Sequence, residues 1–260
     1  MSNLELFPVV FVGAGPGSPD LITVAGRRAL EQADLVVYAG SLVSREMLDW
    51  TGPGVELVDS ASLDLEAIVR ILAAGQRAGG RVVRLHTGDP CLYGAIREQM
   101  DLLDEAGIPY RVIPGVTAAF AAAAALGLEF TLPETTQTLV LTRAAGRTPV
   151  PEKEDLKALA AHGSSLAVYL SAGLADRVRE ALEPEYGPDE PLAVVYKASW
   201  PDEKIIWTTV ARLAGDLAAE GAGRQALILA GPAVSALARK KQAPKSKLYD
   251  AGFSHGYRKS

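Results

Sequence analysis

Apolar residues in this chain gather in short runs of four or five, separated by segments in which they recur every three or four positions. A short continuous run predicts a strand buried on both faces, and the longer spacing predicts an amphipathic helix. In the first half, strands are expected at 9–12, 35–38, 81–85 and 110–113. Strands that alternate with helices predict an α/β fold with a parallel sheet.

The helices of the first half have recognisable starts and ends. Ser18 and Pro19 are typical of an N-cap and a first helical position, so a helix is expected to begin there. Its apolar stripe would be Leu21, Val24, Ala25, Ala29 and Ala33. Further helices are expected around 65–72, around 96–103 and over 116–126. The last is alanine-rich and shorter than the roughly 20 residues that span a membrane.

A second α/β series begins near residue 137. Its strands are expected at 138–142, 166–170, 192–196, 204–207 and 226–229, with helices at 155–161 and 174–182 between them. The pattern therefore predicts an N-terminal domain over 1–133, a C-terminal domain over 134–235 and a tail over 236–260. Two α/β domains leave a cleft, which is a common place for a ligand.

Composition narrows the class of protein. Hydrophobic residues make up 48% of the 260 residues, enough for a sizeable core. The single cysteine, Cys91, excludes an internal disulfide framework and suits a reducing cytosol. Beside Pro90, it is expected to be a small packing residue rather than a nucleophile. No signal peptide is recognisable, so a cytoplasmic protein without membrane association is expected.

Charge is unevenly distributed. The formal net charge is −5, yet from Arg239 onward seven basic residues face one acid, Asp250. A basic tail can bind nucleic acid. This tail lacks a regular basic and aromatic repeat, so no nucleic-acid partner is expected. A solvated tail and a tail folded over a site for anionic ligands both remain open.

Candidate chemistry is concentrated in the loop His86–Gly94. It follows the strand at 81–85 and contains two glycines, Pro90 and one carboxylate, Asp89. In an open α/β sheet, ligands bind beyond the carboxyl ends of the strands. The loop is therefore a candidate site, and the alternative is an ordinary turn between a strand and a helix.

The first strand ends in a second glycine-rich turn, Gly13-Ala14-Gly15-Pro16-Gly17. The dinucleotide fingerprint requires G-x-G-x-x-G, and here the third glycine comes one position early. Pro16 also removes a backbone donor where a pyrophosphate would need one. Binding of NAD or FAD thus stays open only as an alternative.

Other catalytic machinery is sparse. His86, His162 and His255 are far apart and lack cysteine partners at ligand spacing, so no metal site is expected. The sequence has no G-x-S-x-G elbow and no evident pair of catalytic carboxylates. It therefore favours positioning of ligands, as in group transfer from an activated donor.

Four segments in order resemble the tetrapyrrole (corrin/porphyrin) methyltransferase family: 12–23, 33–38, 87–90 and 113–119. Three others, 38–43, 141–149 and 246–258, look like its precorrin-4 C11-methyltransferase branch. The resemblance implies the tetrapyrrole methylase fold, a homodimer, and methyl transfer from S-adenosylmethionine in cobalamin biosynthesis, leaving S-adenosylhomocysteine. The substrate would be precorrin-4 or cobalt-precorrin-4, and the presence of cobalt stays open.

The resemblance also implies site residues. Cofactor contacts would come from Pro16, Thr87, Gly88, Asp89, Leu92, Thr117 and Ala118, with Leu170 and Ala198 from the second domain. Tyr93, Arg143 and Arg147 are expected to bind the substrate, which carries acetate and propionate arms. The tail is expected to help cover the macrocycle, and no catalytic base is identified.

Three rival functions remain open. The first is a methyltransferase of the same fold that acts at another tetrapyrrole carbon or on a different substrate. The second is a nicotinamide or flavin oxidoreductase, and the third is a nucleic-acid binder that uses the tail.

Overall fold

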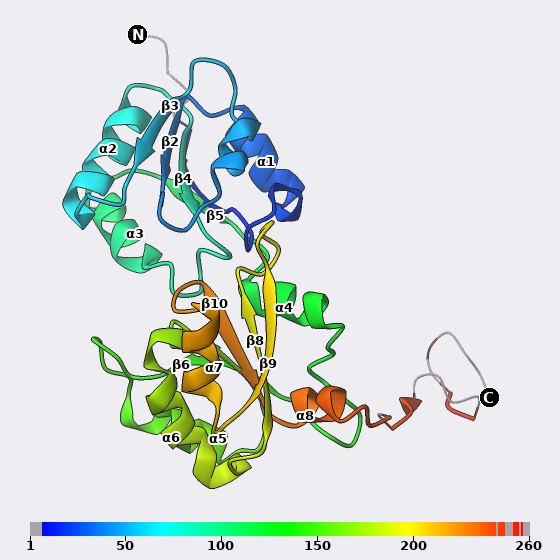
Figure 1. Ribbon diagram of the computed structural model, residues 1–260. Helices are drawn as coiled ribbons and strands as arrows, with labels where there is room; N and C mark the ends of the chain where they lie inside the picture. Colours follow the sequence, from blue (N-terminus) through cyan, green and yellow to red (C-terminus); the bar gives the residue numbers. More distant parts are fainter. Residues whose placement is uncertain (1–6, 243, 248–251, 255, 257–260) are drawn as a thin grey trace. The chain divides into compact units, whose positions relative to one another are not determined.

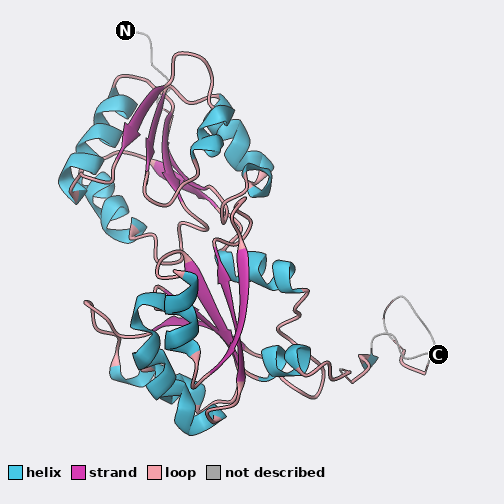
Figure 2. Ribbon diagram, in the orientation of Figure 1, coloured by secondary structure: helices cyan, strands magenta, loops and turns pink. Residues whose placement is uncertain are grey.

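The computed structural model describes residues 7–242, 244–247, 252–254 and 256. The chain divides into two compact units. The first unit contains Met1–Ala121 and Ser199–Pro201, and the second contains Ala122–Ala198 and Asp202–Ser260. Each unit has its own five-stranded sheet with helices beside it (Figures 1 and 2). This confirms the predicted class of two α/β domains.

The first unit is built on a parallel sheet with the strand order β3-β2-β4-β1-β5. The strands are β1 (Val9–Gly13), β2 (Leu35–Tyr38), β3 (Glu56–Asp59), β4 (Val82–His86) and β5 (Tyr110–Ile113). Every residue of β1 and β4 is buried, as expected for central parallel strands. Edge strand β3 was not predicted, because three of its four residues are exposed and two are acidic.

Helices cover both faces of this sheet. α2 (Leu65–Arg77) and α3 (Ile96–Glu105) lie on one side, and α1 (Val24–Glu31) lies on the other (Figure 1). Phe11 and Val37 pack with α2 and α3, whereas Val12 and Val36 pack with Leu30 of α1. The alternation of neighbouring strand residues between two cores explains why the strands read as continuous apolar runs.

The predicted start of the first helix is wrong. The Ser18 hydroxyl accepts the N–H of Asp20, but the turn it begins is a short 3-10 helix, Pro19–Leu21. Ile22 is extended, and α1 begins at Val24 with Thr23 as its N-cap. The predicted apolar stripe is right at Ala29 and Ala33, which pack in the core, and wrong at Val24, which is 65% exposed. The fully buried apolar side chain of this helix is Leu30, which the stripe left out.

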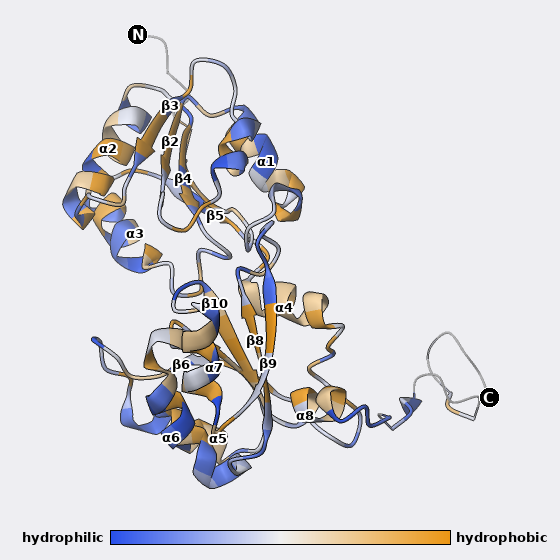
Figure 3. Ribbon diagram, in the orientation of Figure 1, coloured by the Kyte–Doolittle hydropathy of each residue, from blue (hydrophilic) through white to orange (hydrophobic). Residues whose placement is uncertain are grey.

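The second unit has a mixed sheet with the strand order β6-β7-β10-β8-β9. Its strands are β6 (Leu139–Arg143), β7 (Ser165–Tyr169), β8 (Pro191–Tyr196), β9 (Lys204–Thr209) and β10 (Ala226–Ala230). Only β6 and β7 pair in parallel, so β6, β7 and β8 run in one direction while β9 and β10 run in the other. The strands are strongly apolar (Figure 3).

Five helices complete the fold: α4 (Ala118–Leu126), α5 (Leu156–Ala160), α6 (Ala175–Tyr186), α7 (Leu213–Glu220) and α8 (Pro232–Ala238). Leu156 of α5, Val178 of α6 and Leu213 of α7 share one core with Val168 and Val194 of the sheet. Within the described part of the chain, no helix has the length and apolar character needed to cross a bilayer.

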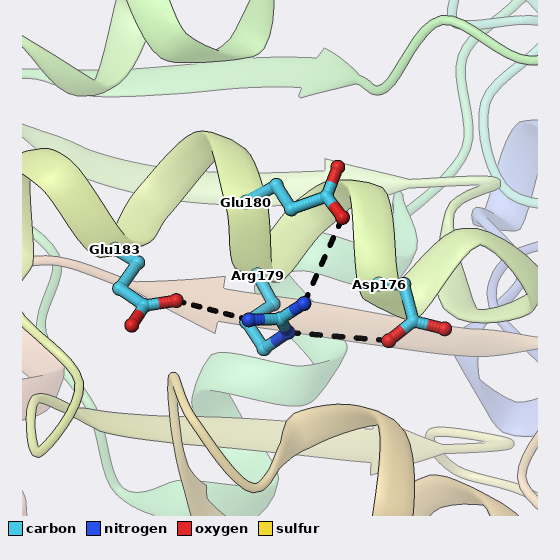
Figure 4. Close-up of polar contacts among 4 residues, drawn as sticks. All are labelled: Asp176, Arg179, Glu180 and Glu183. Carbon is cyan, nitrogen blue, oxygen red and sulfur yellow. Dashed lines mark hydrogen bonds and ion pairs between the residues drawn. The ribbon is translucent and has the colours of Figure 1, made fainter.

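The outer face of α6 is charged. The Arg179 guanidinium lies 3.9 Å from Asp176, 3.7 Å from Glu180 and 3.1 Å from Glu183, all on the same helix (Figure 4). Exposed ion pairs of this kind contribute about 0–1 kcal/mol each. The cluster is a solvated helix surface, and it does not contribute to the site described next.

Candidate functional site

Three turns of the first unit meet at one edge of its sheet. They follow β1 (Gly13–Gly17), β4 (87–95) and β5 (114–117). β1 lies between β4 and β5, and all three strands are parallel, so their carboxyl ends reach the same edge. This is the edge at which open α/β sheets bind ligands.

Backbone hydrogen bonds join the first two turns. Gly88 donates its N–H to the Gly15 carbonyl at 2.7 Å, and Gly15 donates to the Gly88 carbonyl at 3.2 Å. Ala14 donates to the His86 carbonyl at 2.7 Å. Both glycines have left-handed backbones, with φ of +80° at Gly15 and +60° at Gly88. Glycine adopts this conformation at no steric cost, which accounts for its presence here.

The third turn packs against the other two without room for a side chain. A Cβ atom on Gly13 would lie 2.6 Å from the Gly115 Cα and 2.6 Å from the Gly88 carbonyl oxygen. A Cβ atom on Gly115 would come closer still to that oxygen. The three backbones can therefore approach one another only because glycine occupies both positions.

Asp89 ties the second turn to the third. Its Oδ1 accepts the Cys91 N–H at 2.8 Å, and its Oδ2 accepts the Gly115 N–H at 2.9 Å. Hydrogen bonds to an ionised carboxylate are stronger than neutral ones. The carboxylate thus fixes the separation of two loops that leave strands on opposite sides of β1.

These bonds leave the glycine turn after β1 with few free donors. The N–H groups of Ala14 and Gly15 bond to the neighbouring loop, Pro16 has none, and Ser18 donates to the Ser199 hydroxyl at 3.0 Å. A pyrophosphate needs several converging N–H donors. The arrangement therefore disfavours the dinucleotide alternative.

A distant segment covers the same turn, and sequence reasoning missed it. The Trp200 indole donates to the Pro16 carbonyl at 2.9 Å. A Cβ atom on Gly17 would overlap the indole ring, so ring and turn are in direct contact. The residues involved are 184 positions apart. No local spacing signals such a contact; the unusual Ser-Trp-Pro after an apolar strand was the only available hint.

Two groups beside the site are not acid–base catalysts. His86 ends β4, and burial together with the charge of Arg84 lowers its pKa to about 3, so its imidazole is neutral at physiological pH. The prediction that Cys91 packs inside is wrong, because the side chain is exposed. Partial desolvation and the adjacent Asp89 raise the pKa of the thiol, which opposes formation of a nucleophilic thiolate.

Most expected cofactor contacts fall on these three turns: Pro16 on the first, Thr87, Gly88, Asp89 and Leu92 on the second, and Thr117 and Ala118 at the third. Pro16 and Thr117 are buried, and the others are partly exposed. Tyr93, expected at the substrate, follows Leu92 and is 44% exposed. The structure thus brings together eight of the twelve expected positions within the first unit.

The other four expected residues belong to the second unit. Arg143 ends β6, Leu170 follows β7, and Ala198 follows β8, so these three lie at one edge of the second sheet. Leu170 is 70% exposed with a left-handed φ of +54°, and Ala198 is buried. Arg147 is exposed in the loop after β6.

Arg143 shapes its own loop. Its guanidinium donates to the carbonyls of Ala144 at 3.3 Å, Thr148 at 3.1 Å and Pro149 at 2.6 Å. Arg177 adds a bond to the Ala145 carbonyl at 2.9 Å. The loop that carries Arg147 is thus folded around two guanidinium groups.

Part of the expected tail site lies outside the described residues. Residues 248–251, 255, 257 and 258 of the segment 246–258 are among them, including Tyr249, His255 and Tyr257. Among the residues that the structure does describe, no group of three or more His, Cys, Asp and Glu side chains could hold a metal ion.

Comparison with known proteins shows the family of this chain. The family model for Tetrapyrrole (Corrin/Porphyrin) Methylases matches residues 8–214. The Precorrin-4 C(11)-methyltransferase of Pseudomonas aeruginosa is 48% identical over 250 residues, which cover 96% of this chain and 98% of that protein.

Solved structures give the same result. The X-ray structure of a cobalt precorrin-4 methyltransferase, a cobalamin biosynthetic enzyme, superposes with a TM-score of 0.87 at 48% identity, covering 90% of this chain and 98% of that one. Uroporphyrin-III C-methyl transferase from Thermus thermophilus, complexed with S-adenyl homocysteine, has a TM-score of 0.70 at 29% identity, covering 92% and 97%. The chain belongs to the tetrapyrrole (corrin/porphyrin) methylase family.

Proposed function

We propose that this protein transfers a methyl group from S-adenosylmethionine to C11 of precorrin-4 or cobalt-precorrin-4 in cobalamin biosynthesis. The observation that carries the proposal is the convergence of three glycine-containing turns at one sheet edge, in a chain 48% identical to a precorrin-4 C(11)-methyltransferase. The relatives include enzymes named with and without cobalt, so both substrates are included.

The residues of the first unit fit S-adenosylmethionine. The space beside Gly88 is open, since a Cβ atom there would meet only the Thr117 Cα, at 3.9 Å. Pro16, Thr87, Gly88, Leu92, Thr117 and Ala118 would line the cofactor, joined by Leu170 and Ala198 from the second unit. When bound, the cofactor supplies an activated sulfonium methyl group. The relative from Thermus thermophilus, solved with S-adenyl homocysteine, supports this choice.

The protein's own contribution is to orient the reactants and exclude water. Orientation alone can supply several kcal/mol of barrier reduction, about 7–11 in favourable cases. Asp89 serves this purpose by holding two turns together through Cys91 and Gly115, and its remaining lone pairs stay available to a ligand. We assign no catalytic base, and the neutral His86 is not one.

For the substrate, Tyr93, Arg143 and Arg147 are the proposed contacts. Tyr93 offers an exposed aromatic ring, and exposed Arg147 offers a guanidinium to the acetate and propionate arms. Arg143 already donates three bonds to its loop, so its main effect would be to present that loop to the substrate.

The proposed assembly is a cytoplasmic homodimer. Edge strand β9 exposes Ile205, 41% accessible, and Trp207, 45% accessible, on the face opposite the buried Ile206. Large apolar side chains on an edge strand favour burial by another subunit. The single exposed thiol, Cys91, is consistent with a reducing compartment.

The decisive experiment incubates the purified protein with precorrin-4 or cobalt-precorrin-4 and methyl-¹³C S-adenosylmethionine. NMR of the product then locates the new methyl group. Label at C11 is the expected result, and label at another carbon would favour the same-fold alternative. Binding of NAD without binding of S-adenosylhomocysteine, measured by calorimetry, would reject both.

A further inference from the structure

The loop after β4 contains a conformationally costly turn. Tyr93 and Ala95 both have left-handed backbones, with φ of +57° and +49°. Gly94 between them has no room for a side chain, because a Cβ atom there would overlap the Pro90 carbonyl. Residues other than glycine adopt this conformation rarely, and they keep it only where their surroundings determine it.

A buried glutamine determines the end of this turn. Gln99, on the first part of α3, donates its Nε2–H to the Ala95 carbonyl at 3.1 Å. Its Oε1 accepts the Nε–H of Arg84 at 3.2 Å. Both side chains are almost inaccessible, at 4% and 5% exposure. The pair fixes the orientation of the peptide between Ala95 and Ile96.

Arg84 extends the same chain of bonds to strand β2 and to the residue that follows β3. Its Nη1 donates to the Val37 carbonyl at 3.2 Å and to the Ser60 hydroxyl at 3.0 Å. Ser60 donates onward to the Tyr38 carbonyl at 3.0 Å. Tyr38 begins the segment 38–43, which resembles the C11 branch. A single guanidinium thus connects strand β2, Ser60 after β3 and, through Gln99, the loop after β4.

Burial of the Arg84 guanidinium carries a desolvation cost. Burial lowers the pKa of Arg84 to about 10, and it forms no ion pair with any described residue. A buried charge without a partner carboxylate costs more than an apolar side chain of similar size. We attribute the presence of arginine to the hydrogen bonds that its guanidinium donates to Gln99, Val37 and Ser60.

We propose that Arg84 and Gln99 are positioning residues, which hold the Tyr93–Ala95 turn and the carboxyl end of β2 in the shape that methyl transfer requires. The inference rests on the proposed function. Neither side chain would contact the cofactor or the substrate. They would act through the Tyr93–Ala95 turn, which follows Leu92 in the loop after β4, and through the Tyr38 carbonyl at the end of β2.

Gln99→Leu tests this proposal. The variant removes both bonds at nearly constant volume. We expect kcat/KM to fall about tenfold to a hundredfold, as for small displacements of reacting groups. Adding Ala95→Gly should recover much of the loss, because glycine adopts the left-handed conformation without help from Gln99. A residue that only stabilised the fold would lower the melting temperature of the variant and leave kcat/KM of the folded protein unchanged.

Gln76→Leu is the matched control. Gln76 lies on α2, is 1% exposed, and donates to the Phe7 carbonyl at 3.0 Å, next to the amino end of β1. The Gln76→Leu variant should have a lower melting temperature but unchanged kcat and KM. If Gln99→Leu does not fold, Gln99→Glu serves instead, because its carboxylate accepts from Arg84 but cannot donate to Ala95.

Three outcomes would overturn the inference: unchanged kinetics in a folded Gln99 variant, a kinetic loss of equal size in Gln76→Leu, or a loss that Ala95→Gly does not reduce. Failure of the proposed function is a separate result, in which the unaltered protein itself transfers no methyl group to the tetrapyrrole. S-adenosylhomocysteine calorimetry on the same four proteins provides a second measurement, with weaker binding in Gln99→Leu and recovery in the double variant as the expected result.

Discussion

Asp89 accepts the Gly115 N–H through its Oδ2 at 2.9 Å and the Cys91 N–H through its Oδ1 at 2.8 Å. Asp59 presents a contrasting case at the end of β3. There one oxygen, Oδ1, accepts both N–H groups, from Gly40 at 3.0 Å and from Ala61 at 2.9 Å. Replacement of one carboxylate oxygen by an NH₂ group would therefore break a hydrogen bond at Asp89 but not at Asp59.

Asparagine should replace Asp59 more easily than Asp89. The amide oxygen of Asp59→Asn can accept both bonds, whereas in Asp89→Asn the NH₂ group must face one of two N–H donors. An unsatisfied donor costs about 1–3 kcal/mol. We expect Asp89→Asn to lower the free energy of unfolding by about that amount and to weaken S-adenosylhomocysteine binding, as measured by denaturation and calorimetry. Equal effects at the two positions would contradict this prediction.

Gly115→Ala should damage the site severely. The new methyl group would overlap the Gly88 carbonyl, so the turns after β4 and β5 must separate. Overpacking of this kind costs about 1–3 kcal/mol. Gly215→Ala is the control, since it lies in α7 with nothing within 4 Å of its Cβ position. Thermal unfolding should show a lower melting temperature for the first variant, and an equal or higher one for the second.

His86 should not titrate between pH 5 and 8. Its pKa in the folded protein is about 3, below the ordinary value of 6.5, because of burial and the charge of Arg84. The unfolded chain binds the proton more readily, so the stabilising effect of the neutral imidazole is complete above pH 6.5. It declines by up to ~1.4 kcal/mol per pH unit as the pH falls toward 3. Imidazole NMR shifts of the labelled protein check this, and a midpoint above 5 would refute it.

Arg143→Lys should loosen the loop after β6. A lysine ammonium cannot direct planar bonds to the Ala144, Thr148 and Pro149 carbonyls together. We expect a higher KM for the tetrapyrrole with little change in KM for the cofactor. Arg212→Lys provides a surface control, because among the described residues the Arg212 guanidinium bonds only to the Asp216 carboxylate, at 3.0 Å. A parallel rise in both KM values would contradict a role at the substrate.

Deletion of residues 244–260 should raise KM for the tetrapyrrole more than KM for the cofactor. The deleted tail carries lysines and arginines that can pair with carboxylate arms, and aromatic side chains that can pack on the ring. Steady-state kinetics of the full-length and shortened proteins measure both constants. Identical kinetics of the two proteins would show that the tail does not contribute to substrate binding.

Local pattern predicted every strand except β3, and it predicted the loop that contains Asp89, because these features depend on neighbours in the sequence. The central strands read as apolar runs, and Asp89 follows one of them. Pattern gave the wrong start for α1, because Ser18 caps only the short 3-10 helix and Thr23 is the N-cap of α1. It also missed the bonds of Arg84 to Val37 and Ser60, because no periodicity relates residues that only the folded sheet brings together.

The contact of Trp200 with Pro16 and Gly17 also affects the order in which this protein can be completed during synthesis. The glycine turn is translated 184 residues before Trp200, which emerges from the ribosome only after β6, β7 and β8 of the second sheet. Domains usually fold as they are made, from the amino end. The turn after β1 therefore stays uncovered until Trp200 has been made, so a fragment ending at residue 121 would lack the indole that contacts Pro16 and Gly17.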